Sequence, residues 1–213
     1  GGELKKIAEK NFLPFATFPE GTLTPRQSPG MMFYGLTKLL KAAGLKIKIG
    51  DFSKEADFGS LRNKGKEIAS RLKDKVVVIY TDESHRYLGY VWKIKINETA
   101  KNPAFNNVLP EMNHNEITGF DGKKFNGAAI FIGSASNPRM EKRFQLTEKL
   151  LGEKGIRVIK LKLSGKTEIE KTWNMMVLAD WTSYFLAKLN GVPEKEFNIV
   201  NPKIVLALKK LMG

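Results

Sequence analysis

Residue types that carry much protein chemistry are scarce here, since the sequence contains no cysteine and only two histidines, His85 and His114. The absence of cysteine excludes disulfide bonds, cysteine nucleophiles and metal sites built from thiolates. With two histidines and no His-Glu-x-x-His motif, the sequence also argues against a histidine-rich metal site. A magnesium site made of carboxylates alone stays open.

Long hydrophobic runs are absent as well. No segment reaches the roughly 20 apolar residues that a membrane-spanning helix needs, and no charged and then apolar signal sequence is visible at the start. We therefore expect a cytoplasmic protein with no membrane partner. Hydrophobic residues still make up 42% of the 213 residues, which is enough for a core in one large domain, or in one domain and part of a second.

Acidic residues are few relative to basic ones: 22 Asp and Glu oppose 36 Lys and Arg, which gives a net charge of +14. Such an excess of positive charge is typical of proteins that bind nucleic acids. However, the lysines are scattered along the sequence and no nucleic-acid-binding motif accompanies them. We favour a solvated basic surface first, steering of an anionic substrate second and nucleic-acid binding last. No nucleic-acid partner is therefore expected.

From residue 75 onward, short apolar runs alternate with longer segments of helical periodicity. The runs Val76–Tyr80, Ala128–Ile132 and Arg157–Leu163 have the continuous apolar character of strands buried in a parallel sheet. The helices expected around them are Ser84–Lys101, Asn113–Thr118, Pro138–Leu151 and Thr167–Asn190. This alternation predicts an α/β fold, namely a doubly wound parallel sheet with helices on both faces.

The preceding residues lack this alternation. Leu4–Glu9 predicts the end of a helix, Phe12–Phe18 a strand interrupted by proline, and Met31–Ala43 a helix with an apolar stripe. The Pro- and Gly-rich segment Pro19–Gly30 is expected to be a loop. A charged helical connector is expected next, which divides the chain into segments 1–50, 51–74 and 75–213.

Two polar loops follow predicted strands, where ligands bind in open α/β sheets. One loop contains Ser84, and the other contains Ser134 and Ser136. These serines are candidate ligand-binding residues. The alternative is ordinary helix capping by Ser84, Asp82 or Asn137, which contributes about 1 kcal/mol for each cap.

Glu98 is the most informative ionisable residue of the chain. In a helix over Ser84–Lys101, the spacing puts Tyr87, Val91, Ile94 and Glu98 on one stripe. If that stripe faces inward, three apolar or aromatic side chains shield a carboxylate from water, as a general base requires. The alternative is a glutamate that points out past the last helical turn.

For the other residues that could belong to a functional site, we favour structural roles. We expect Glu111 and Glu116 to orient the imidazole of His114 or to face water, and His85 to lie on the surface. The three tryptophans and the Met175-Met176 pair occupy helical positions typical of core residues.

Two sequence blocks carry a family resemblance. They are Asn97-Glu98-Thr99-Ala100-Lys101 and Pro110-Glu111-Met112-Asn113-His114-Asn115-Glu116. Both blocks and their separation resemble the sugar-isomerase (SIS) domain family, specifically its bifunctional phosphoglucose/phosphomannose isomerases, although Thr99 replaces the usual Asn. The resemblance implies that Glu98 moves a proton between C1 and C2 of the open-chain sugar. It also implies that His114 assists ring opening from the neighbouring subunit of a homodimer.

Two further segments fit the same family. Thr24-Pro25-Arg26-Gln27-Ser28 is similar to its Pro-Arg loop, which gives Arg26 the role of stabilising the enediolate. The C-terminal segment from Asn201 is similar to its last helix, where Lys209, or else Lys210, would assist ring opening. The implied substrate is a sugar phosphate, namely glucose 6-phosphate and mannose 6-phosphate converted to fructose 6-phosphate. This chemistry needs no metal or other cofactor.

The resemblance covers the C-terminal two-thirds of the family's chain. It implies a flavodoxin-like SIS domain over 75–213 and a partial remnant of the first SIS half over 1–50. The loops that hold the sugar phosphate in the family have no counterpart here, so we expect a fragment that is inactive in isolation. A sugar-phosphate-binding SIS module without catalysis is the alternative.

Overall fold

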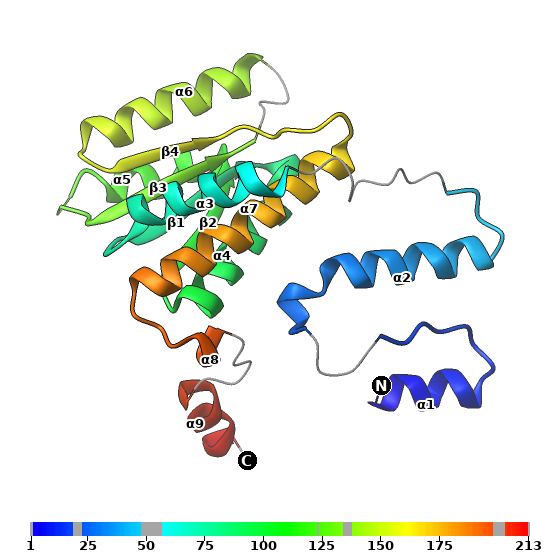
Figure 1. Ribbon diagram of the computed structural model, residues 1–213. Coiled ribbons are helices and arrows are strands. Elements are labelled where there is room, and N and C mark those ends of the chain that lie inside the picture. The colour runs from blue at the N-terminus through cyan, green and yellow to red at the C-terminus, as the bar shows by residue number, and fades with distance from the viewer. Residues whose placement is uncertain are drawn as a thin grey trace. The chain divides into compact units, whose positions relative to one another are not determined.

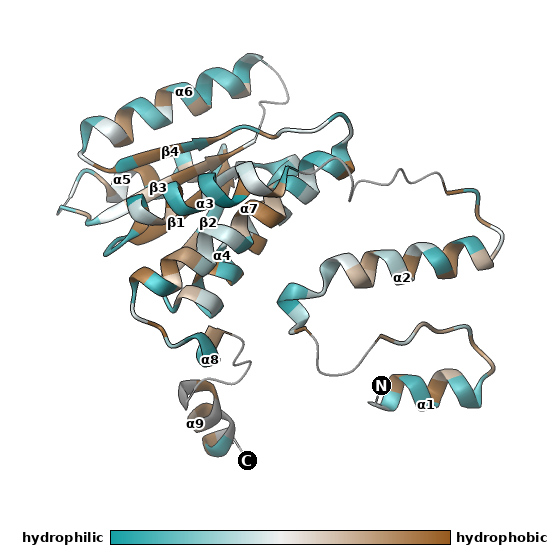
Figure 2. Cartoon of the chain, in the orientation of Figure 1, coloured by the Kyte–Doolittle hydropathy of each residue, from teal (hydrophilic) through white to brown (hydrophobic). Residues whose placement is uncertain are grey.

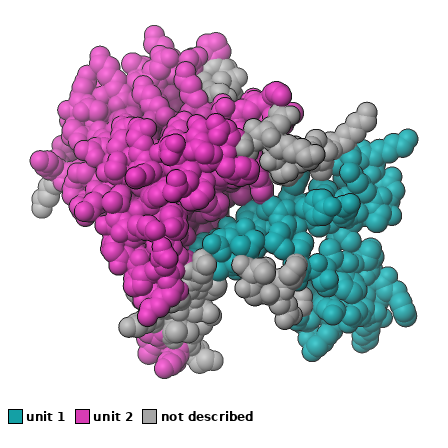
Figure 3. Space-filling view, viewed as in Figure 1, with its two compact units in different colours: residues 1–51 teal, residues 52–213 magenta. Residues whose placement is uncertain are grey.

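The computed structural model describes residues 2–18, 23–47, 57–122, 124–133, 138–197 and 203–212. The chain divides into two compact units, unit 1 (Gly1–Asp51) and unit 2 (Phe52–Gly213) (Figure 3). The three-segment division expected from the sequence stays a prediction. The helix that lies in the expected connector, α3 (Phe58–Leu72), packs within unit 2.

Unit 1 contains two α-helices and one short 3-10 helix, namely α1 (Gly2–Lys10), η1 (Pro25–Gln27) and α2 (Pro29–Ala42). Both helices predicted there are confirmed. The predicted strand over Phe12–Phe18 is wrong, because this segment forms no strand. Pro14 has no backbone N–H to donate, and the described part of unit 1 contains no strand with which the segment could pair.

Unit 2 is built on a four-stranded parallel sheet in the order β2-β1-β3-β4 (Figure 1). Val77 of the central strand β1 pairs with Ala104 of β2 on one side and with Ala128 of β3 on the other. The predicted doubly wound α/β fold is therefore confirmed. The strands are β1 (Val76–Asp82), β2 (Ala104–Leu109), β3 (Gly127–Ile132) and β4 (Arg157–Leu161).

Helices cover both faces of this sheet. On one face, Val77 and Ile79 pack with Trp92 and Leu178 in a core shared by α3, α4 (Arg86–Ala100) and α7 (Glu168–Leu189). On the other face, a core built around Tyr80, Phe131 and Phe144 joins the sheet to α6 (Pro138–Glu153) and the 3-10 helix η3 (Glu111–Asn113). Figure 2 shows the contrast between the apolar strand β3 and the largely hydrophilic α6. The short helix α5 (Glu116–Gly119) follows η3.

Helices α3 and α7 approach each other closely at Gly65. A Cβ atom at this position would lie 2.6 Å from Trp181 Cβ and 3.0 Å from the backbone nitrogen of Thr182. Only a residue without a side chain fits there. Gly65 therefore permits the helix packing that covers one face of the sheet.

Strand β2 was not predicted from the sequence. Its central residues, Asn106 and Asn107, are half-buried polar side chains in a strand that pairs only with β1 among the described residues. The sequence of β2 therefore lacks the continuous apolar run that indicates a strand buried on both faces. Two short helices end the chain, α8 (Glu194–Phe197) and α9 (Lys203–Met212), and α9 is the helix expected at the C-terminus.

Candidate active site and family

Glu98 lies in the last turn of α4, and its side chain is exposed in the single chain. Of the two interpretations, the inward-facing stripe is wrong and the outward-pointing glutamate is confirmed. Helix α4 buries Leu88, Trp92 and Ile96 instead, whereas Tyr87 is 43% exposed. The buried stripe starts one residue further along, which rotates it by about 100° around the helix. Within one protomer, water therefore reaches the Glu98 carboxylate.

His114 lies beyond the opposite end of the next strand. After β2, the chain forms η3, and the backbone N–H of His114 donates to the carbonyl oxygen of Glu111 at 2.9 Å. The imidazole is exposed. Glu111 accepts a hydrogen bond from Asn115 Nδ2 at 2.8 Å, which fixes the turn that carries the histidine.

The six residues of β2 separate the two candidate catalytic groups. Glu98 precedes this strand and His114 follows it. At about 3.3 Å per residue, a strand of this length spans about 20 Å, so the two side chains lie near opposite ends of β2.

Arg26 lies in unit 1, in the 3-10 helix η1, and is half-buried. The turn is fixed locally, because Gln27 Oε1 accepts hydrogen bonds from Thr24 N at 3.1 Å and from Thr24 Oγ1 at 3.0 Å. Ser28 Oγ donates to the Thr24 carbonyl oxygen at 2.8 Å. Arg26 is therefore held on a short, internally hydrogen-bonded turn that begins with Pro25.

Of the three candidate serines, Ser84 is described, whereas Ser134 and Ser136 lie outside the described residues. Ser84 belongs to the 3-10 helix η2 (Glu83–His85), and its hydroxyl donates to Asp82 Oδ1 at 2.8 Å. Asp82 caps η2 by accepting from the backbone N–H of His85 at 3.0 Å. The capping alternative thus applies to Asp82.

Lys209 lies on α9, and Lys210 follows it on the same helix. The position of the Lys209 side chain lies outside the described part of the structure. Its role in ring opening therefore stays a prediction.

His85 differs from the surface residue that we expected. Its side chain is buried, and Nδ1 lies 2.7 Å from Asp82 Oδ1. The spacing of three residues between Asp82 and His85 is the signal that could have revealed this contact, since an aspartate before a helical turn bonds to groups three positions later.

Glu116 also has a contact that the sequence did not reveal. Its carboxylate accepts hydrogen bonds from the buried hydroxyl of Tyr80 at 3.0 Å and from Asn107 Nδ2 at 2.5 Å. Burial raises the pKa of the Tyr80 hydroxyl far above its ordinary value, and the neighbouring Glu116 carboxylate raises it further. Glu116 thus ties the turn that carries His114 to the central strand.

The family of the chain follows from a comparison of sequences. Residues 61–203 match the family described as the bacterial phospho-glucose isomerase C-terminal SIS domain, which is more than half of the chain. The chain belongs to this family. The matched region includes Glu98, His114 and Ser84, whereas Arg26 precedes it and Lys209 follows it.

Two relatives with described activities are similar in sequence to this chain. A bifunctional phosphoglucose/phosphomannose isomerase from Aquifex aeolicus is 30% identical over 209 residues, which cover 95% of this chain and 65% of the relative. A D-glucosamine-6-phosphate 4-epimerase from Sulfolobus acidocaldarius is 32% identical over 128 residues, which cover 59% of this chain and 42% of the relative. The chain therefore spans slightly less than two thirds of the isomerase's length.

A solved structure shares the fold. A hypothetical protein from Thermus thermophilus superposes with a TM-score of 0.65 at 17% identity, over 100% of this chain and 61% of that chain. Among the described residues of this SIS-domain chain, no helix is both long and apolar enough to cross a membrane. The same residues contain no group of three or more His, Asp or Glu side chains able to hold a metal ion.

Proposed function

We propose that the protein is a metal-independent aldose–ketose isomerase that interconverts glucose 6-phosphate, and mannose 6-phosphate, with fructose 6-phosphate through an enediolate. Membership of the SIS family and the 30% identity to the Aquifex isomerase support this proposal. In it, Glu98 moves the proton between C1 and C2, and Arg26 stabilises the enediolate. His114 and Lys209 assist ring opening, and Ser84, Ser134 and Ser136 contact the sugar.

The separation of Glu98 and His114 across β2 carries the quaternary part of the proposal. Because about 20 Å separates the ends of this strand, a shared active site requires Glu98 from one subunit and His114 from another. A cytoplasmic homodimer with two such sites meets this requirement. A second subunit that covers Glu98 would also exclude water from the carboxylate, which strengthens its electrostatic interactions with the substrate.

A complementation experiment tests this proposal. Glu98→Gln and His114→Ala variants of the full-length protein are unfolded together, mixed and refolded, and formation of fructose 6-phosphate from glucose 6-phosphate is measured. Each variant alone should be nearly inactive. In a mixed dimer, one site has lost both groups and the other has kept both, so random pairing should restore about a quarter of wild-type turnover.

Several outcomes would contradict parts of this proposal. If the mixture stays as inactive as its components, the two groups do not meet across an interface. If Glu98→Gln alone turns over like the wild type, Glu98 is not the base. Glu67→Gln provides the matched control, because Glu67 is an exposed carboxylate on α3. Retained substrate binding without turnover in the wild type would favour the non-catalytic SIS module.

The similarity to the Sulfolobus epimerase supports a second candidate function, epimerisation of an amino sugar phosphate at C4. Product analysis after separate incubations with glucosamine 6-phosphate and glucose 6-phosphate distinguishes the two functions. Conversion of glucosamine 6-phosphate with no conversion of glucose 6-phosphate would favour this candidate over the isomerase.

A further inference from the structure

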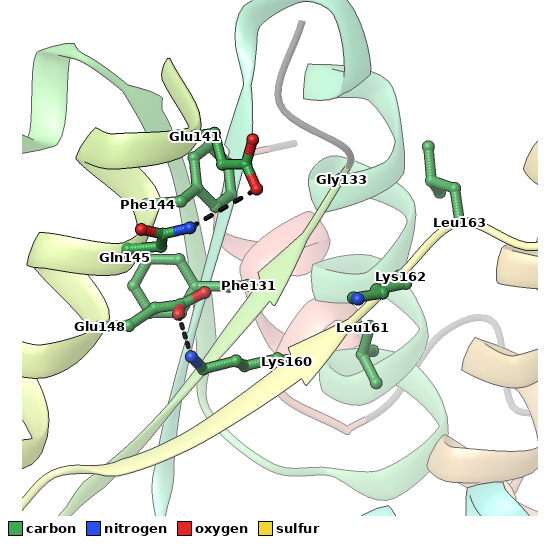
Figure 4. Close-up of a pocket in the computed structure, with 10 residues that line it drawn as sticks. All are labelled: Phe131, Gly133, Glu141, Phe144, Gln145, Glu148, Lys160, Leu161, Lys162 and Leu163. Carbon is green, nitrogen blue, oxygen red and sulfur yellow. Dashed lines mark hydrogen bonds and ion pairs between the residues drawn. The ribbon is translucent and has the colours of Figure 1, made fainter. Parts of the chain in front are cut away.

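Glu98, the proposed base, lies at the amino end of β2, away from a pocket at the other end of the sheet. That pocket, about 600 Å³ in volume, lies beside α6 at the carboxyl ends of β3 and β4 (Figure 4). Its charged residues include Lys160 and Glu148, which form an ion pair with each other (Figure 4). Glu98 does not line this pocket. Contacts within the connection from α4 to β2 therefore determine where the Glu98 carboxylate lies.

The last turn of α4, Asn97-Glu98-Thr99-Ala100, is intrinsically weak. Asparagine and threonine are poor helix formers. The Glu98 carboxylate also lies at the negative end of the helix dipole, and no basic residue in this turn offsets it. By its own sequence, this turn would therefore fray, and the position of Glu98 would vary with it.

The side chain of Asn97 joins this weak turn to the first residue of β2. Asn97 Nδ2 donates to the Ala104 carbonyl oxygen at 3.1 Å, and Asn97 Oδ1 accepts from the Ala104 backbone N–H at 2.7 Å. One side-chain amide thus pairs with both backbone polar groups of one residue. We call these two hydrogen bonds the Asn97 clamp.

Ala104 needs these partners because it is buried and its backbone groups face the outer edge of the sheet. On the inner side of β2, the Val77 backbone N–H donates to the Pro103 carbonyl oxygen at 3.0 Å. Successive residues of a strand direct their backbone groups to alternate sides, so Ala104 faces away from β1. Among the described residues, no strand lies on that side of β2. Ala104 is only 2% exposed, and buried backbone groups almost always have partners, which Asn97 supplies.

The backbone on the other side of Glu98 is held as well. Lys101 ends α4 in the left-handed region, with a φ of 52°, and its backbone N–H donates to the Ile96 carbonyl oxygen. Lys101 Nζ donates to the carbonyl oxygen of Glu98 itself. Glu98 therefore lies between two hydrogen-bonded points, the Asn97 clamp before it and the Lys101 cap after it.

We propose that Asn97 is a positioning residue for Glu98, because its clamp on Ala104 holds the last turn of α4 where the carboxylate can meet C1 and C2 of the sugar. This inference rests on the proposed role of Glu98 as the base. A general base must lie within hydrogen-bond reach of the proton that it removes, and a displacement of about 1 Å can slow a reaction about a hundredfold. Asn97 acts through Glu98, since its own amide is directed to Ala104.

Steady-state kinetics of the full-length protein with glucose 6-phosphate test this role. Asn97→Ala should lower kcat about 10- to 100-fold, because the carboxylate is no longer held in line with the proton. KM should change by less than about threefold, since the substrate contacts remain. A residue that served stability alone would leave the kcat of the folded enzyme unchanged.

Asn102→Ala is the matched control. Asn102 Nδ2 also donates to backbone carbonyl oxygens, to Lys75 at 3.0 Å and to Pro103 at 3.2 Å, but Asn102 follows the helix and holds the chain to β1. Both alanine variants should lower the urea midpoint of unfolding by similar amounts, because each loses two hydrogen bonds. Asn102→Ala should nevertheless keep kcat within about twofold of the wild type.

Asn97→Asp tests the clamp even if the alanine variant fails to fold. Aspartate keeps an acceptor for the Ala104 N–H but replaces the donor with an oxygen atom that repels the Ala104 carbonyl oxygen. Its kcat should still fall about fivefold or more. In the 213-residue chain, the amide hydrogens of Glu98 and Thr99 should also exchange about fivefold faster or more in Asn97→Asp, whereas Asn102→Ala should leave their exchange unchanged.

The outcomes separate this inference from the proposed function. Wild-type kcat in Asn97→Ala or Asn97→Asp, beside an inactive Glu98→Gln, would overturn the positioning role and keep Glu98 as the base. Equal losses of kcat in Asn97→Ala and Asn102→Ala would also overturn it, because any weakening of the connection would then suffice. Wild-type turnover in Glu98→Gln would remove Glu98 from the mechanism, and the positioning role of Asn97 with it.

Discussion

Unit 1 and unit 2 differ in where their apolar side chains lie. Among the described residues, every buried hydrophobic side chain belongs to unit 2, from Ile68 to Phe197. Unit 1 instead leaves large apolar side chains exposed, including Leu4, Phe12 and Met32. The described residues of unit 1 form helices with exposed apolar side chains and no cluster of buried hydrophobic residues.

The difference shows which interactions fix each unit. In unit 2, a sheet covered on both faces makes each strand depend on the helices that pack on it. In unit 1, η1 is held by hydrogen bonds within the segment from Thr24 to Ser28. Substitutions should therefore change the free energy of unfolding strongly in unit 2 and weakly in unit 1.

The largest expected effect comes from Trp92→Ala. Trp92 is fully buried between α4 and α7, and its Nε1 donates to the Met175 carbonyl oxygen at 3.2 Å. Truncation should lower the free energy of unfolding by about 3–5 kcal/mol, as for other buried aromatic residues. Urea unfolding measures this change. The matched variant Phe12→Ala, at a side chain 96% exposed in unit 1, should change it by less than about 0.5 kcal/mol. If both variants lost a similar amount of unfolding free energy, the proposed difference between the core of unit 2 and the exposed side chains of unit 1 would be wrong.

Gly65→Ala should have the next largest effect. The added methyl group would lie 2.6 Å from Trp181 Cβ, so α3 and α7 must move apart, at a cost of about 1–3 kcal/mol. Gly152→Ala on α6 is the control, because nothing lies within 4 Å of its Cβ position. Alanine should stabilise that helix by up to about 1 kcal/mol. Calorimetric melting temperatures that move in the same direction for both variants would contradict the close approach of α3 and α7.

Stability above pH 10 should depend on Tyr80. The raised pKa of its buried hydroxyl means that the folded protein holds this proton more tightly than the unfolded chain does. The resulting stabilisation is complete below the ordinary tyrosine pKa of about 10 and is lost as pH rises above that value. The wild type should therefore lose up to about 1.4 kcal/mol per pH unit relative to Tyr80→Phe.

Urea unfolding at intervals from pH 8 to pH 11.5 measures this dependence. Tyr80→Phe should start less stable, since it loses the hydrogen bond to Glu116, and should then fall less steeply. Parallel curves for the two proteins would show that the Tyr80 hydroxyl does not contribute to the pH dependence.

Much of unit 2 could be predicted because its central strands, β1 and β3, are largely apolar and buried. Their continuous apolar runs give a signal that does not depend on neighbouring strands. Strand β2 could not be found in this way, since Asn106 and Asn107 enter the sheet only through pairing with β1. The predicted strand at Phe12–Phe18 failed for the converse reason, because a suitable composition has no neighbouring strand in the described part of unit 1.

The candidate site shows a similar division. Sequence motifs located Glu98 and His114, but periodicity could not orient Glu98. Helix α4 has apolar residues around most of its circumference, so two stripes compete, and packing against α7 selects the one that contains Trp92. The Asp82–His85 contact could have been predicted from the spacing of three residues between the two side chains. The interpretation of His85 as a surface residue did not use this spacing.

The smallest effect should come from the ion pair between Lys5 and Glu9 on α1, with an Nζ–Oε1 distance of 3.7 Å. Both side chains are about half exposed, and the lysine precedes the glutamate, which is the weaker orientation in a helix. Lys5→Gln should therefore speed hydrogen exchange of the α1 amides by less than about twofold, corresponding to roughly 0.4 kcal/mol. Exchange accelerated tenfold would mean that a single surface pair holds α1 in place. That result would remove the distinction between a unit stabilised by its core and a unit without one.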